Sequence, residues 1–400
     1  MNTLEILDKL VAFETVSAAS NLQLIAYVED LLKGNGFRVR RLTSPCGNKA
    51  GLYAEIGPQV AGGLLLSGHT DVVPTDGQTW TKPPFKLTHE GGKLFGRGTT
   101  DMKGFVASAL ALAVKAKGLS LQRPLAIVLS YDEEIGCVGM QAMKRDLASL
   151  LRSPALCIVG EPTEMQVATG HKGKAAFQAT FYGEAGHSAL APKFTNALHL
   201  AADFMGELRG IQAELAENGP YDTAYEVPYT TLHVGKLSGG TALNIIPALA
   251  EMHFEMRTLA LQDVPVLNDR IDGIVSNINA ARICISLERG NTYPGLDVDA
   301  SQSWVKKFAE LAQQGLTKVA FGTEAGILTE MGVPTLVCGP GSMEKQGHKA
   351  DEFIDMQQLA ACDDLLDRLM PNLMESPERK HEIKASLENG DGYICSRQQR

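Results

Sequence analysis

The sequence places a histidine and an aspartate two positions apart at the end of an apolar run. His69 and Asp71 follow Leu64-Leu65-Leu66, which is typical of a buried strand. In an extended chain residues i and i+2 project to the same side, so the two side chains face one way. A histidine that binds a metal usually donates its second ring N–H to a carboxylate or a carbonyl, and Asp71 is one source of that acceptor. A structural histidine bonded to a turn aspartate gives the same pattern, so the pair alone does not establish a metal site.

Further carboxylates and a second histidine follow other apolar runs in the same way. They are Asp101, the adjacent pair Glu133 and Glu134, Glu161 and His348. We expect these strand ends to meet at one edge of a sheet, where so much like charge is unfavourable without cations. Imidazole together with carboxylate is a ligand set suited to zinc, cobalt or manganese. The pattern therefore predicts two divalent metal ions, with one bridging carboxylate, a histidine and an acid for each ion, and one free carboxylate as the base.

The elements that must position these residues alternate along the chain. Helical periodicity covers four stretches of the first half, at about 3–15, 20–36, 103–118 and 139–151. The apolar runs between them indicate an α/β fold with a largely parallel mixed sheet. From about 172 the order becomes strand–helix–strand–strand–helix–strand, which is typical of a ferredoxin-like α+β domain with an antiparallel sheet. We therefore divide the chain into three units. The catalytic domain comprises 1–171 and 289–374, the inserted domain comprises 172–288, and a polar C-terminal extension comprises 375–400.

The composition excludes some classes of function. Hydrophobic residues make up 44% of the 400 residues, which is ample for a core. The net charge of −9, with no basic stripe, argues against nucleic acid as the main partner. The seven cysteines are scattered without a C-x-x-C pair, which indicates reduced thiols. Because no run approaches the ~18 apolar residues of a membrane span, we expect a cytoplasmic protein with a small-molecule substrate and no membrane partner.

Six motifs together resemble the di-zinc aminoacyl hydrolase family of metallopeptidases and deacylases. They are "SGHTDVVP", "GRGTTDMKG", "YDEEIG", "GEPT", "GEAGHSALAP" and "GHKADE". The resemblance extends from the N-terminus to about residue 372. Within the family it is closest to the acetylornithine deacetylases, on stretches that include "HTDVVPTDGQTWTKPPF" and "GTEAGIL".

The resemblance implies an enzyme with two divalent metal ions, which are zinc ions or cobalt ions that replace them. It also implies that the enzyme hydrolyses N2-acetyl-L-ornithine to L-ornithine and acetate in arginine biosynthesis. Desuccinylation, deacylation of another N-acyl amino acid and dipeptide cleavage are reactions of the same scaffold and stay open. A third class is a relative without catalysis that acts as a binding protein. Such a relative would have lost ligands or the base, and all of these positions are intact here.

The resemblance assigns the metal ligands. Asp101 bridges both ions, His69 and Glu161 hold one ion, and Glu134 and His348 hold the other. The peptide bond after the bridging aspartate is often cis in this family. Before the late acidic pair relatives usually carry an Ala-His-Gln-Pro-type run, where this chain has "GHKADE". The spacing from the histidine to the acidic pair is kept, which supports the ligand assignment.

The resemblance also assigns residues that act on the substrate. Glu133 is the general base and Asp71 orients the first histidine. The inserted domain corresponds to a lid and dimerisation domain, which implies a homodimer. There His187 polarises the scissile carbonyl, commonly from the partner subunit. Asn244 and Arg257 bind substrate, and a guanidinium suits the α-carboxylate as a bidentate partner.

Some residues keep more than one interpretation. Glu324 in "GTEAG" either approaches a side-chain amine of the substrate or is a solvated loop carboxylate. Lys349 departs from the family pattern and bears on side-chain selectivity. Asp351 and Glu352 are expected to support the loop before them. His171 is expected to be structural, although it begins the inserted domain near the site.

Overall fold

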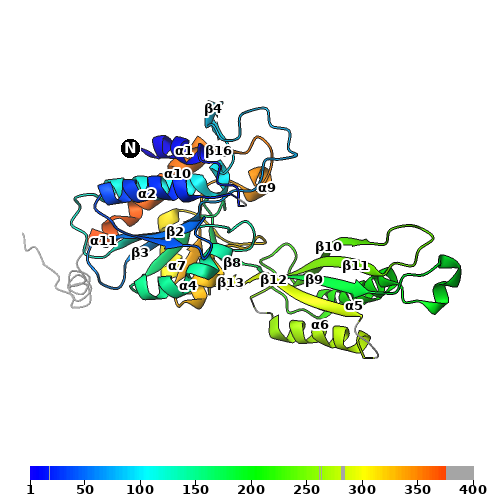
Figure 1. Cartoon of the computed structure of the whole chain (residues 1–400). Helices are drawn as coiled ribbons and strands as arrows, with labels where there is room; N and C mark the ends of the chain where they lie inside the picture. The colour runs from blue at the N-terminus through cyan, green and yellow to red at the C-terminus, as the bar shows by residue number, and fades with distance from the viewer. Residues whose placement is uncertain (18, 261, 263, 281–283, 375–400) are drawn as a thin grey trace, which may run out of the picture.

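The structure is a computed structural model that describes residues 1–17, 19–260, 262, 264–280 and 284–374. The predicted extension over 375–400 lies outside the described residues. Figure 1 shows a larger α/β unit and a smaller unit that projects to one side of it. No helix among the described residues is long and apolar enough to cross a membrane. All six described cysteines are unpaired.

A mixed sheet with a parallel centre forms the middle of the larger unit. Its order is β1-β2-β6-β3-β7-β15-β8-β13, with β14 paired to β8. Its strands are β1 (Arg38–Thr43), β2 (Ala50–Ile56), β3 (Leu64–His69), β6 (Leu125–Ser130), β7 (Leu156–Val159), β8 (Val167–His171), β13 (Leu296–Asp297), β14 (Leu316–Val319) and β15 (Thr335–Val337). Strand β3 pairs in parallel with β6 and β7, and β15 pairs in parallel with β7. The predicted α/β class is therefore confirmed.

Helices cover both faces of this sheet, as Figure 1 shows for α1 and α2 on one side and α4 on the other. The helices of the larger unit are α1 (Thr3–Val11), α2 (Leu22–Gly34), α3 (Gly104–Ala116), α4 (Val138–Leu150), α7 (Ser303–Ala312), α8 (Ala325–Glu330), α9 (Met343–Gln346), α10 (Met356–Leu369) and α11 (Pro371–Met374). The first four lie where the periodicity predicts them. Strands β3 and β6 are buried along their whole length because both faces are covered.

The smaller unit is built from the predicted inserted segment. It contains β9 (Gly173–Tyr182), α5 (Ala197–Asn218), β10 (Thr231–Gly239), β11 (Leu249–Thr258), α6 (Val264–Ile278) and β12 (Ile285–Tyr293). Its antiparallel sheet has the order β10-β11-β9-β12, which is the ferredoxin-like arrangement. Buried and half-buried residues alternate along β9 and β11, since helices cover only one face. Strand β12 runs past residue 288, so the small sheet extends beyond the predicted boundary.

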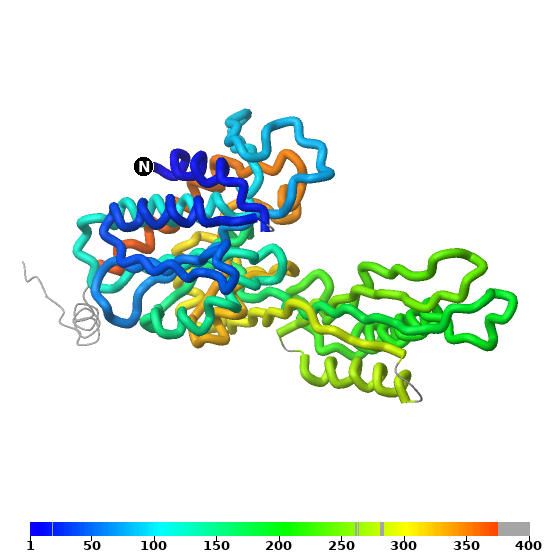
Figure 2. The backbone as a smooth tube through the Cα atoms, in the orientation of Figure 1, coloured from blue at the N-terminus to red at the C-terminus, as the bar shows by residue number. Residues whose placement is uncertain are grey.

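Two short connections join the units. The chain leaves β8 for β9 and returns from β12 to β13 (Figure 2). The connections run side by side, because Leu296 pairs with His171 in one sheet and Tyr293 pairs with Lys174 in the other. A third sheet, β16-β5-β4, joins β4 (Thr88–Glu90) and β5 (Lys93–Phe95) to β16 (Phe353–Asp355). This small sheet brings the segment before α3 beside the segment after α9.

Candidate active site

The central strands bring the predicted residues to one edge of the large sheet. His69 ends β3, Glu133 and Glu134 follow β6, and Glu161 follows β7. Because these strands are parallel, their carboxyl ends lie at the same edge. Asp101 lies in the π-helical turn η1 (Thr99–Lys103) that enters α3, and the peptide bond after it is cis, as expected.

Asp101 lies between the two histidines. Its Oδ1 is 3.1 Å from Nε2 of His69, and its Oδ2 is 3.1 Å from Nε2 of His348. Each histidine also meets a second acid: Glu161 Oε1 is 3.5 Å from His69 Nε2, and Glu134 Oε2 is 3.0 Å from His348 Nε2. One histidine and one acid on each side of a shared carboxylate is the arrangement that a bridged pair of metal ions requires.

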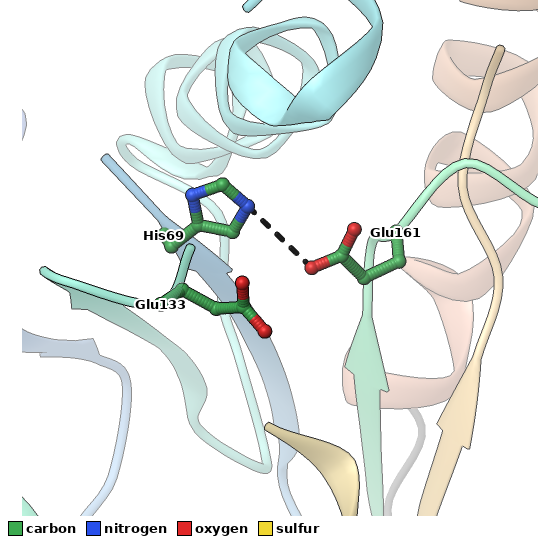
Figure 3. Close-up of side chains that lie close together, drawn as sticks. All are labelled: His69, Glu133 and Glu161. Carbon is green, nitrogen blue, oxygen red and sulfur yellow. Dashed lines mark ion pairs between the residues drawn. The ribbon is translucent and has the colours of Figure 1, made fainter. Parts of the chain in front are cut away.

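The donor atoms are close enough to hold cations. The ligand atoms of His69, Glu133 and Glu161 lie within 4.8 Å of one another, as do those of His69, Asp101 and Glu134. Figure 3 shows the three side chains of the first group converging from different segments. Oε1 of Glu134 is buried and has no hydrogen-bond partner among the described residues. An unpartnered buried carboxylate oxygen is unfavourable, so the residues fit a divalent cation, and their imidazole and carboxylate donors suit zinc.

Burial of so many carboxylates shifts their pKa values. Burial raises the pKa of Glu133 to about 8 and that of Glu134 to about 7, and neighbouring carboxylates add to both shifts. Burial also raises the pKa of Glu161. Hydrogen bonds to Asp101 and Glu134 raise the pKa of His348 to about 10. The cluster therefore binds positive charge strongly, and divalent ions would lower the pKa of each carboxylate that they contact.

Asp71 contacts both His69 and the segment after β6. Nδ1 of His69 is 3.0 Å from the backbone oxygen of Asp71 and 3.5 Å from its Oδ1. The Asp71 carboxylate also accepts hydrogen bonds from the backbone N–H of Glu133 at 3.1 Å and of Glu134 at 3.3 Å, and from the Ser17 hydroxyl at 2.8 Å. It thereby holds the segment after β6 in place against the end of β3.

A buried ion pair supports the segment that carries Asp101. Nη1 of Arg97 is 2.7 Å from Oε2 of Glu352, and both side chains are 1% exposed. The Glu352 carboxylate accepts hydrogen bonds from the backbone N–H groups of Gly98, Thr100 and Asp101 at 3.0, 2.9 and 3.1 Å. Glu352 was expected to support the loop that carries His348. Its carboxylate instead supports the segment that carries Asp101. Arg97 was not predicted, because one arginine in "GRGTTD" has no distinguishing pattern.

The segment that carries His348 is tied down by different contacts. Nε2 of Gln78 donates to the backbone oxygen of His348 at 2.8 Å. The Asp351 carboxylate accepts hydrogen bonds from the backbone N–H of Thr81 at 2.8 Å and of Lys82 at 3.2 Å. The loop between β3 and β4 therefore positions His348, which gives Asp351 the supporting role expected of it.

A cavity of about 320 Å³ opens above the carboxylates, between the two units. Asp101, Glu133 and His348 line it on one side, and Lys174 and Arg257 line it from the smaller unit. The predicted substrate-binding arginine therefore faces the same space as the predicted base.

His187 and Asn244 lie elsewhere on the smaller unit. They are close to each other, because His187 forms a β-bridge with Ile245 and the Ser188 N–H donates to the backbone oxygen of Asn244 at 3.1 Å. Both side chains are exposed, and neither residue is among those that line the cavity. Within one chain the structure does not bring them to the carboxylates.

Glu324 is 1% exposed, so the interpretation as a solvated loop carboxylate is wrong. It accepts hydrogen bonds from the hydroxyls of Ser130 and, at 3.3 Å, Ser67, which lie on β6 and β3. It is not among the residues that line the cavity. His171 is also buried, with Nδ1 3.0 Å from the Lys172 oxygen and Nε2 accepting from the Gly326 N–H at 3.3 Å, as a structural histidine does.

Comparison with known proteins identifies relatives along almost the whole chain. A model of peptidase family M20/M25/M40 matches residues 65–372. An acetylornithine deacetylase from Shigella sonnei is 35% identical over 373 residues, which are 91% of this chain and 95% of that protein.

Solved structures share the fold at lower identity. A metallo-carboxypeptidase of the M20 family from Sulfolobus solfataricus has a TM-score of 0.77 at 17% identity, over 92% of this chain and 98% of that chain. A dinuclear metal-binding peptidase of the M20 family from Bacillus subtilis has a TM-score of 0.63 at 15% identity, over 92% of this chain and 96% of that chain.

Proposed function

The chain belongs to peptidase family M20/M25/M40, and we propose that it hydrolyses N2-acetyl-L-ornithine to L-ornithine and acetate, a step of arginine biosynthesis. The observation that carries this substrate is the 35% identity to an acetylornithine deacetylase over 91% of the chain. The cavity geometry supports the reaction type, since an aspartate between two histidines lies beside a further carboxylate that can act as a base.

The proposed cofactors are two divalent metal ions, which are zinc ions or cobalt ions that replace them. His69 and Glu161 would hold one ion, Glu134 and His348 the other, and Asp101 would contact both, as their present distances suggest. The chemistry that such a pair supplies is polarisation of the scissile carbonyl and a lowered pKa of water.

Glu133 is the general base in this proposal. Its carboxylate lines the cavity, where it accepts a hydrogen bond from Sγ of Cys137 at 3.2 Å. The backbone N–H of Glu133 donates a hydrogen bond to the Asp71 carboxylate at 3.1 Å. Glu133 takes a proton from the water that attacks the acyl carbon and passes it to the leaving α-amine. Catalysis of this kind contributes about 10²- to 10⁴-fold to the rate.

The smaller unit binds and covers the substrate in this proposal. Arg257 holds the α-carboxylate, and its guanidinium is fixed at 2.8 Å from Glu255 and 2.9 Å from the Tyr293 hydroxyl. His187 and Asn244 complete the site from a partner subunit in a homodimer formed through this unit. The six described cysteines are unpaired, which supports a cytoplasmic location.

A matched panel of substrates tests the proposal. We would compare hydrolysis of N2-acetyl-L-ornithine, N-acetylcitrulline, N-acetylmethionine, N-succinyl-diaminopimelate and a dipeptide by the zinc- or cobalt-loaded protein, with Glu133→Ala as the control. We expect the highest kcat/KM for N2-acetyl-L-ornithine, lost in the control. A preference for another member would refute the substrate and keep the reaction type.

A further inference from the structure

Two cationic side chains of the smaller unit face the cavity from neighbouring strands. Lys174 on β9 and Arg257 on β11 are direct partners in the antiparallel register, and both line the cavity. Like charges directly opposite in a sheet are destabilising. A pair of this kind inside a substrate cavity is therefore explained best by an anion that it binds.

One carboxylate compensates the pair only in part. Oε1 of Glu255 accepts from Nε of Arg257 at 2.8 Å, and its Oε2 is 3.4 Å from Nζ of Lys174. Tyr293, which pairs with Lys174 on the other side of β9, accepts from Nη1 of Arg257 at 2.9 Å through its hydroxyl. Burial raises the pKa of that phenol, so it stays neutral at physiological pH. These four side chains carry two positive charges and one negative charge.

The opposite wall of the cavity does not offset this surplus. Its carboxylates, Asp101, Glu133, Glu134 and Glu161, carry four negative charges when ionised. Two divalent cations would neutralise them. In the metal-loaded protein the excess charge facing the cavity is then the positive charge of the smaller unit.

We infer that Lys174 determines specificity by binding, together with Arg257, the free α-carboxylate of the substrate. The guanidinium presents a planar set of donors and the ammonium a compact point charge, so the two are complementary around one carboxylate. Lys174 then selects a free carboxylate over the corresponding amide. This inference rests on the proposed function, because it takes an N-acyl amino acid as the ligand.

The test is calorimetric binding of N-acetylglycine and N-acetylglycinamide to the metal-loaded protein in a Glu133→Ala background, which prevents turnover. Neither ligand has a side chain, so the result does not depend on which amino acid is natural. We expect Lys174→Met to raise the Kd of the acid about 10- to 100-fold, the range for a lost hydrogen bond to a charged group. The Kd of the amide should not change, and Lys174→Arg should restore binding of the acid.

Lys144→Met is the matched control. Nζ of Lys144 is 2.7 Å from Oε2 of Glu330 on the surface, and neither residue lines the cavity. Binding of the acid that is independent of Lys174, or an equal loss for acid and amide, would overturn the inference. The substrate panel judges the proposed function separately, since a wild-type protein inactive on every member can still show the difference between acid and amide.

Discussion

Replacing Arg97 with methionine should destabilise the protein strongly, although Arg97 does not touch the cavity. Methionine fills much of the same volume but leaves the Glu352 carboxylate, 1% exposed, without its counter-ion. Breaking a buried pair by removing one partner costs about 3–5 kcal/mol. Three backbone N–H donors within 3.1 Å still stabilise the carboxylate in the variant. We therefore expect a loss at the lower end, about 3 kcal/mol.

The loss should depend on pH with a defined sign. Burial raises the pKa of Glu352 even beside Arg97, and removing the arginine raises it further. The folded variant then binds a proton more tightly than the unfolded chain, in which the carboxyl has a pKa of about 4.3. The destabilisation is consequently small at pH 4–5 and grows as the pH rises toward neutrality.

The assay is urea unfolding followed by circular dichroism at pH 5 and pH 7.5. Lys115→Met is the control, because its 2.6 Å pair with Asp367 is half-exposed on both sides and should contribute only about 0–1 kcal/mol. A loss for Arg97→Met no larger than the control, or a loss that grows as the pH falls, would show that the buried pair with Glu352 does not stabilise the protein in this way.

Three further predictions concern the carboxylate cluster. Glu133→Gln should lower kcat by about 10²- to 10⁴-fold, while elemental analysis still finds both metal ions. Asp101→Asn should lower the content of both ions, whereas retention of one at full occupancy would contradict a bridging role. After chelation, the Tm should fall as the pH rises from 5 to 9, and metal-loaded protein should lack this slope. The folded pKa values of Glu133, Glu134 and His348, about 8, 7 and 10, exceed their unfolded values, so each group binds protons more tightly when folded and that stabilisation is lost in this range.

The strand-end residues were predictable because their signal is local. An apolar run that stops at a histidine or a carboxylate marks both a buried strand and the edge at which it ends. The cluster of His69, Glu133, Glu134 and Glu161 follows from parallel strands alone. The inserted domain was predictable for the same reason, since its order of strands and helices can be predicted from local patterns without long-range contacts.

Contacts between segments far apart in the sequence were not predictable. Glu324 lies in a glycine-containing segment that resembles a surface loop. Its buried position beside Ser67 and Ser130 depends on strands that are far away in the sequence. The Asp71 carboxylate accepts hydrogen bonds from backbone N–H groups of the segment after β6, and such donors have no sequence signature. The position of His187 depends on how the smaller unit is placed relative to the larger one, and no local sequence pattern predicts that placement.

We propose that two metal ions and one free carboxylate carry out amide hydrolysis at this sheet edge. The most direct measurement is release of acetate from N2-acetyl-L-ornithine, followed by proton NMR, as zinc or cobalt is titrated into chelator-treated protein. We predict that the rate rises until two ions are bound per chain and is then constant, and that Glu133→Ala binds the same two ions with no detectable release. Full activity without added metal, or undiminished activity of Glu133→Ala, would contradict this mechanism.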